Sequence, residues 1–197
     1  MVTESNEEAH WEALERALNE MEVLRAIYGI VDGEGNDASS FAIVSPPENE
    51  LDGLQRALGM IEEDDAGESD DAERPQMITE LRITIQVHID PNDDGDDEKT
   101  RVLLGFRLPM GYPEISPAFV TSLQTSPQQL HRNVIDEINR SLNERAKTLL
   151  GSEAVMDLVE DAKNMCLEKH VERIEQNQLE EAIDQVQQPQ TLGRRWI

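Results

Sequence analysis

The chain contains a single cysteine, Cys166, and lacks the clustered cysteines and histidines that bind structural zinc. One thiol cannot form an internal disulfide, which is more typical of an intracellular protein than of a secreted one. No apolar run approaches the roughly 20 residues that a membrane span requires. The first residues have neither the basic start and apolar core of a signal peptide nor the arginine-rich composition of a transit peptide. We therefore expect a cytoplasmic location, with the nucleus as the alternative.

Basic residues are also scarce, at 17 against 42 acidic ones, which gives a formal net charge of −25. This charge disfavours binding to nucleic acid and to anionic membranes, because phosphates would be repelled. It favours solubility and a protein partner with a surface rich in lysine and arginine. No Ser/His/Asp arrangement, phosphate-binding loop or ligand cluster indicates an enzyme, a cofactor or a metal.

A helix is predicted for residues 7–28, following a flexible N-terminus at residues 1–6. Apolar side chains recur there at steps of three and four, and they form one stripe: Trp11, Leu14, Leu18, Met21, Leu24 and Tyr28. A neighbouring stripe is acidic and consists of Glu8, Glu12, Glu15 and Glu22. Such a stripe is either a solvated helix face or a docking face for a basic partner.

Two acidic segments carry much of the negative charge. Residues 48–76 are predicted to be a disordered insertion, because eleven acids and one base lie between Glu48 and Glu73. Within it, LDGLQRALGMI has leucines at helical spacing, which suggests either a transient helix or one that folds on a partner. The second segment, 90–99, is predicted to be a hairpin loop. It resembles a calcium loop at its start, but Arg101 stands where the twelfth-position glutamate should be.

Four strands are predicted from β-type patterns. Residues 81–89 alternate apolar and polar side chains without interruption, and residues 102–108 repeat the alternation after the acidic loop. Shorter candidates are residues 41–44 and 118–123. Consecutive strands joined by hairpins form an antiparallel meander, so the fold class is α+β.

Two C-terminal helices are expected to cover one face of that sheet. The first is predicted to begin with Ser126 as its N-cap and to end at Gly151. The second follows Ser152 and places Cys166 on its buried stripe, where it is a core residue rather than a nucleophile. Residues 169–197 form a polar helical tail with a flexible end, either a solvated helix or a dimeric coiled coil.

The stretch RLPMGYPEISPAFV places a stiff turn directly after the third strand. Proline fixes φ and removes backbone donors, so Pro113 and Pro117 stop the chain from extending the ladder. Tyr112 is expected to bury its ring while its hydroxyl bonds to the backbone.

This turn, with LRAIYG at the end of the first helix and LLGSEAVMDLVEDAKNM near the last, resembles the RWD domain family over roughly residues 7–168. The resemblance implies the fold of ubiquitin-conjugating enzymes. An active enzyme of that kind needs a cysteine just downstream of the proline-rich turn and a His-Pro-Asn motif, and residues 118–165 hold neither. The resemblance therefore implies a fold without the chemistry.

RWD domains dock onto partner proteins, so the resemblance also implies a non-catalytic interaction module. The best-known example, in the general-control stress kinase, is also acidic and binds a ribosome-associated activator in amino-acid starvation signalling. Small stand-alone members are thought to compete for that activator or to partner translation-linked GTPases. The alternative is an accessory factor of the ubiquitin pathway that recruits a conjugating enzyme or its substrate.

Overall fold

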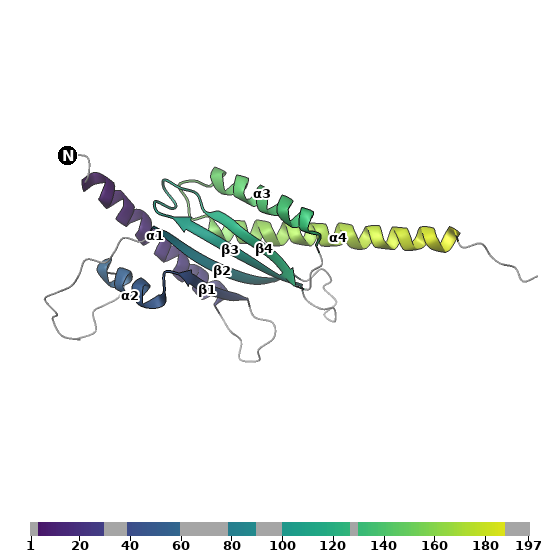
Figure 1. Cartoon of the computed structure of the whole chain (residues 1–197), viewed down its shortest axis with the longest axis horizontal. Coiled ribbons are helices and arrows are strands. Elements are labelled where there is room, and N and C mark those ends of the chain that lie inside the picture. The colour runs from purple at the N-terminus through teal and green to yellow at the C-terminus, as the bar shows by residue number, and fades with distance from the viewer. Residues whose placement is uncertain (1–3, 30–38, 60–78, 90–99, 127–129, 188–197) are drawn as a thin grey trace, which may run out of the picture.

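The computed structural model describes residues 4–29, 39–59, 79–89, 100–126 and 130–187. Within these ranges the elements follow the order α1 (Glu4–Tyr28), β1 (Ser40–Ser45), α2 (Glu48–Ala57), β2 (Glu80–Ile89), β3 (Thr100–Pro109), β4 (Phe119–Ser126), α3 (Arg132–Thr148) and α4 (Val155–Gln187). The predicted α+β class and the order of helix, strands and helices are confirmed (Figure 1).

The four strands form one antiparallel sheet in the order β1-β2-β3-β4, which confirms the predicted meander. Alternation along β2 sets the register, because a slip of one residue would turn its apolar side chains to solvent. Ile83 lies opposite Phe106 and Ile85 opposite Leu104, and all four are buried. One face of the sheet is thus the wall of the core.

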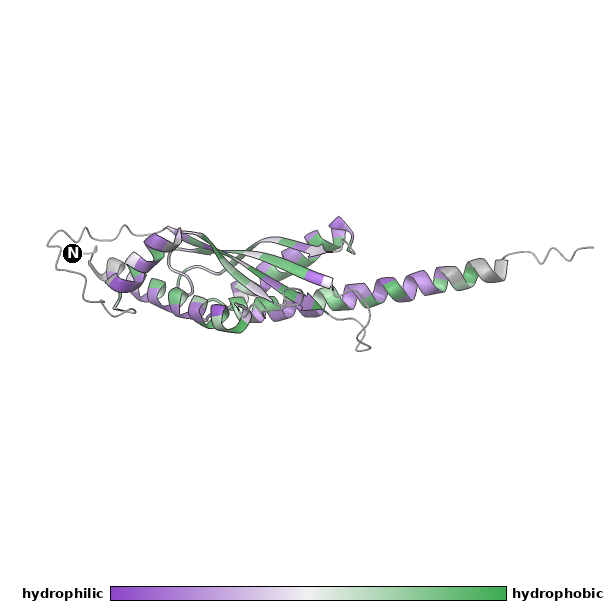
Figure 2. Cartoon of the chain, turned by 90° about the horizontal axis from the view of Figure 1, so that it is seen from below, coloured by the Kyte–Doolittle hydropathy of each residue, from purple (hydrophilic) through white to green (hydrophobic). Residues whose placement is uncertain are grey.

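The helices pack against that wall and form the second layer. Figure 2 shows α1 and α4 running below the sheet, and the far part of α4 extending past it. The face of α1 that points to the sheet carries Leu18, Met21 and Leu24, each at most 3% exposed. α3 packs against β4 and α4, and the side-chain amide of Asn143 exchanges two hydrogen bonds of 3.0 Å with the backbone of Val120. That amide covers part of the sheet edge that would otherwise be open.

One prediction was wrong in a way that matters for the fold. Residues 48–57, assigned to a disordered insertion, form the helix α2. Its Leu51 and Leu54 are 3% and 2% exposed, so the helix is an integral part of the packed domain. Burial of two leucines stabilises this short helix by several kcal/mol, which outweighs its high charge and its internal Gly53. Residues 60–76 of the predicted insertion, and the hairpin loop with its calcium-like start, lie outside the described residues.

The helix boundaries also differ from the expected ones. α1 begins at Glu4, so residues 4–6 are helical rather than part of a flexible end. α3 begins at Arg132 with His131 in the N-cap position, whereas Ser126, the predicted N-cap, is the last residue of β4. α4 continues without a break to Gln187, so the core helix and the described part of the predicted tail are a single helix. Residues 188–197 lie outside the described ranges.

Candidate functional site

The tyrosine–proline turn lies between β3 and β4, as predicted. Tyr112 and Pro113 are buried, and the tyrosine is only 2% exposed. The turn closes with a 2.7 Å hydrogen bond from the N–H of Ile115 to the carbonyl of Gly111. Gly111 has a φ of +84°, a left-handed conformation that glycine adopts at little cost. Pro117 lies between the turn and β4, so the motif forms the corner at one end of the sheet.

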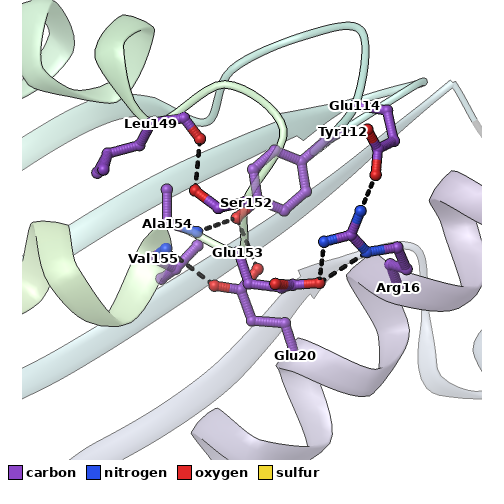
Figure 3. Close-up of polar contacts among 9 residues, drawn as sticks. All are labelled: Arg16, Glu20, Tyr112, Glu114, Leu149, Ser152, Glu153, Ala154 and Val155. Atoms are coloured by element: carbon purple, nitrogen blue, oxygen red, sulfur yellow. Dashed lines mark hydrogen bonds and ion pairs between the residues drawn. The ribbon is translucent and has the colours of Figure 1, made fainter.

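The hydroxyl of Tyr112 joins this corner to two helices (Figure 3). It accepts a 2.7 Å hydrogen bond from the N–H of Ala154, which confirms the predicted contact with the backbone. It also donates a 2.6 Å hydrogen bond to Oε2 of Glu20 on α1. The other oxygen of Glu20 accepts a 2.8 Å bond from the N–H of Val155. One carboxylate and one hydroxyl thus tie α1 to the first turn of α4 through the Tyr112 corner.

Burial changes the acid–base behaviour of this network. Glu20 is 7% exposed, and loss of solvation raises its pKa to about 7, against the opposing effects of its hydrogen bonds to Tyr112 and Val155. The pKa of Tyr112 is also raised, first by burial and then by the neighbouring Glu20. The hydroxyl therefore stays protonated, and the carboxyl group titrates near neutral pH.

A half-exposed ion-pair cluster covers the outer side of the network. Arg16 of α1 pairs with Glu114 in the turn, and its Nε donates a 2.7 Å hydrogen bond to Glu153. The pKa of Glu153 is lowered by a hydrogen bond from the backbone of Glu153 itself and by the pairing with Arg16. The N–H of Gly151 donates a 3.0 Å bond to the carbonyl of Pro113 and adds a further link. The whole cluster fixes the helices to the sheet, which is a structural role.

Cys166 lies on α4 and is fully buried. Burial raises its pKa to about 11, so the thiol is protonated at neutral pH and unsuited to nucleophilic attack. The prediction that it is a core residue is confirmed. Within the described ranges, no group of three or more metal-ligating side chains is placed to hold an ion. None of the described helices is long and apolar enough to cross a membrane.

The four glutamates of the acidic stripe, Glu8, Glu12, Glu15 and Glu22, are all exposed on α1. They share one side of the helix because their spacing is four, three and seven residues. Oε1 of Glu22 accepts a 3.2 Å hydrogen bond from Gln55 of α2, so that end of the stripe borders α2.

An apolar pocket lies beside the acidic stripe. α1 contributes Trp11 and Leu14 to its lining, the ends of β2 and β3 contribute Leu81 and Leu108, and the turn after β3 contributes Met110. Trp11 and Leu14 are partly exposed, and Met110 is 42% exposed. Trp11 is three residues from Glu8 and four from Glu15, which makes it a neighbour of both on the helix surface. The stripe and the pocket thus form one amphipathic surface.

Glu20 is the main residue that sequence reasoning missed. It follows Ala13 and Ala17 and precedes Leu24 at helical spacing, and those three residues are buried. A carboxylate in the apolar stripe of a helix must find hydrogen-bond donors inside the protein. The position of Glu20 in the helix could have indicated that it is buried. Its hydrogen-bond donors, Tyr112 and Val155, could not be identified in this way, because they are more than 90 positions away in the chain.

These features define a class of protein: a two-layer α+β domain in which a tyrosine–proline corner binds the sheet to its helices. A family model described as RWD domain matches residues 46–166, which is more than half of the chain. The chain therefore belongs to the RWD domain family. A search of curated proteins found no match. RWD domains are protein–protein interaction modules and are typically non-catalytic, so the partners of this domain are proteins. α1 lies outside the matched segment, yet Glu20 binds it to that segment.

Proposed function

We propose that the protein is a non-catalytic docking module that binds a lysine- or arginine-bearing segment of a partner through α1. The observation that carries the proposal is the exposed acidic stripe beside the apolar pocket. An amphipathic basic segment would place an apolar side chain against Trp11 and Leu14 and its cations over the glutamates. The apolar contact would supply affinity, because single exposed ion pairs contribute only about 0 to 1 kcal/mol each.

The carboxylates have a second effect, on the rate of encounter. A net charge of −25 attracts a basic segment over a distance of about 10 Å at moderate salt. Exposed charges of this kind mainly increase the association rate and select the orientation of the partner. Binding should therefore weaken as salt is added.

We further propose that the partner belongs to translational control, in amino-acid starvation signalling. Support comes from membership of the RWD family and from the strong acidity of the chain. This step rests on analogy within the family, because a fold does not by itself determine a partner. The expected partners are a ribosome-associated activator or a translation-linked GTPase, each with a basic segment.

Affinity purification from native extract, with identification of the captured proteins by mass spectrometry, tests the cellular role. Enrichment of ribosome-associated factors or translation-linked GTPases supports it. Enrichment of ubiquitin-conjugating enzymes or their ligases instead would support an accessory role in that pathway and contradict the proposal.

The surface is tested with the captured partner and a variant that reverses all four stripe residues to lysine. We expect the association rate at low salt to fall by about tenfold or more. The matched control variant has the same net charge. It reverses to lysine four exposed acids on α3 and α4, namely Glu137, Glu168, Glu175 and Glu180. Equal losses in the two variants, or binding insensitive to both, would show that α1 is not the docking surface.

A further inference from the structure

The face of the sheet that the helices leave uncovered has the opposite charge character to the rest of the molecule. Along the four strands, the charged side chains are three arginines and one glutamate: Arg82, Arg101, Arg107 and Glu80. All four residues alternate with the buried ones, so they lie on the uncovered face. A protein with a formal charge of −25 thus presents one surface with a local excess of positive charge.

Two of these arginines are placed directly opposite each other. Arg82 on β2 is the cross-strand partner of Arg107 on β3. Like charges in that position repel each other and destabilise a sheet. Both depend on one carboxylate: Nε of Arg82 donates a 2.6 Å hydrogen bond to Glu80, while Nη1 of Arg107 lies 3.9 Å from it. Among the residues that the structure describes, these two guanidinium groups share the carboxylate of Glu80, which leaves capacity for a second carboxylate.

Arg107 is held in a defined position. Its guanidinium carbon lies 4.8 Å from the ring centroid of Phe119 on β4, which is a cation–π contact. The side chain remains 42% exposed, whereas Nε has no hydrogen-bond acceptor in the part of the chain that the structure describes. Stacking on an aromatic ring reduces the entropy that a guanidinium loses when it binds a carboxylate.

The row of outward residues next to the arginine pair consists of small side chains. Thr84, Gly105 and Ser122 lie side by side across β2, β3 and β4. A Cβ atom at Gly105 would lie 2.5 Å from Oγ of Ser122 and 3.0 Å from Oγ1 of Thr121, so a larger residue there would require these side chains to move. The short side chains of Thr84 and Ser122 therefore leave a low part of the face beside the two arginines.

We infer that the uncovered sheet face is a second docking surface, and that it binds an acidic segment of another protein. Carboxylates of that segment pair with Arg82 and Arg107, and an apolar side chain rests near Phe119. Guanidinium forks bind carboxylates with two parallel hydrogen bonds, which favours aspartate and glutamate as ligands. Three arginines are too few to track a nucleic-acid backbone against the net charge of the chain. The inference does not depend on the α1 surface, because it concerns the opposite layer and a partner of opposite charge.

The test uses the full chain and a short fluorescein-labelled peptide in which glutamates flank a single leucine. Its titration into isotopically labelled protein at low salt should shift the backbone amide signals of Arg82, Thr84, Gly105 and Ser122. The same peptide with glutamine in place of glutamate should cause no such shifts. Shifts confined to other surfaces, or tighter binding of a single-stranded oligothymidylate, would overturn the inference. So would a wild-type chain that self-associates through these strands, because a second copy would then be the occupant.

Variants connect the binding to the arginine pair. Arg82→Gln with Arg107→Gln should weaken binding of the glutamate peptide by about tenfold or more, since charged hydrogen bonds are lost. Its unfolding temperature should stay close to that of the wild type, because relief of the like-charge contact offsets the lost contacts with Glu80 and Phe119. The matched control, Arg140→Gln with Arg173→Gln, changes the same charge at exposed positions on α3 and α4 and should bind as the wild type does. Equal weakening of peptide binding in both double variants would show that only the net charge of the protein matters, and it would refute the proposed site.

Discussion

Replacing Glu20 by glutamine should remove a large part of the pH dependence of stability between about pH 5 and pH 8. Glutamine keeps an oxygen that can accept from the N–H of Val155 and an amide that can reach the hydroxyl of Tyr112. It therefore resembles the protonated form of Glu20 and cannot ionise. Wild type and variant should differ little at the acidic end of this range and diverge as the pH rises.

The magnitude follows from the raised pKa. The pKa of Glu20 is about 7 in the folded chain against an ordinary value of 4.5, so the folded state binds more protons between these values. Stability from this group is complete below the lower pKa and is lost as pH rises through the higher one. The free energy of unfolding of the wild type should fall, relative to the variant, by about 2 to 3 kcal/mol from pH 5 to pH 8.

Urea unfolding, followed by circular dichroism at several pH values, measures this difference. A change of that size shifts the urea midpoint by about 1 M or more. Glu12→Gln is the matched control, because it removes an exposed carboxyl group from the same helix and should follow the wild type. Parallel stability curves for wild type and the Glu20 variant would show that Glu20 ionises normally in the folded protein, and the account of its burial would be wrong.

Tyr112→Phe leaves a backbone amide and a buried carboxyl group without their hydroxyl partner, and should lower the free energy of unfolding by about 2 to 4 kcal/mol. Tyr28→Phe, at a half-buried position, is its control, and equal losses would contradict the role of the corner. Leu54→Ala should cost about 2 to 5 kcal/mol because α2 belongs to the core, whereas Leu179→Ala, at 63% exposure, should cost little. Cys166 should react with a thiol reagent at least about a hundredfold more slowly in the native chain than in denaturant, because burial raises its pKa from 9.0 to about 11. Rapid native labelling would place the thiol at the surface.

The sheet could be predicted from the sequence because its signal is local. Alternation along β2 and β3 specifies both strands and the buried face, and the prolines after β3 specify the corner. Tyr112 could be assigned a buried ring and a bonded hydroxyl from its amphipathic chemistry alone.

The errors arose where tertiary contacts override local composition. α2 has a charge typical of disordered segments, and only the burial of Leu51 and Leu54 makes it part of the core. The partners of Glu20 and the Arg82–Arg107 pair depend on chain segments brought together by folding. The spacing within α1 could identify the acidic stripe, but the pocket beside it needs side chains from β2 and β3.

Because α4 is one continuous helix, its C-terminal part is a rigid arm that projects from the domain. The buried stripe that includes Cys166 anchors the near end, and the helix then continues to Gln187, past the sheet (Figure 1). Those last turns reach about 30 Å beyond the anchor at a rise of about 1.5 Å per residue. A protein bound at the far end of α4 would therefore keep a fixed distance and orientation relative to a second protein bound to the domain. Inserting a single residue into the arm would push the two apart by about 1.5 Å and turn one around the other by about 100°.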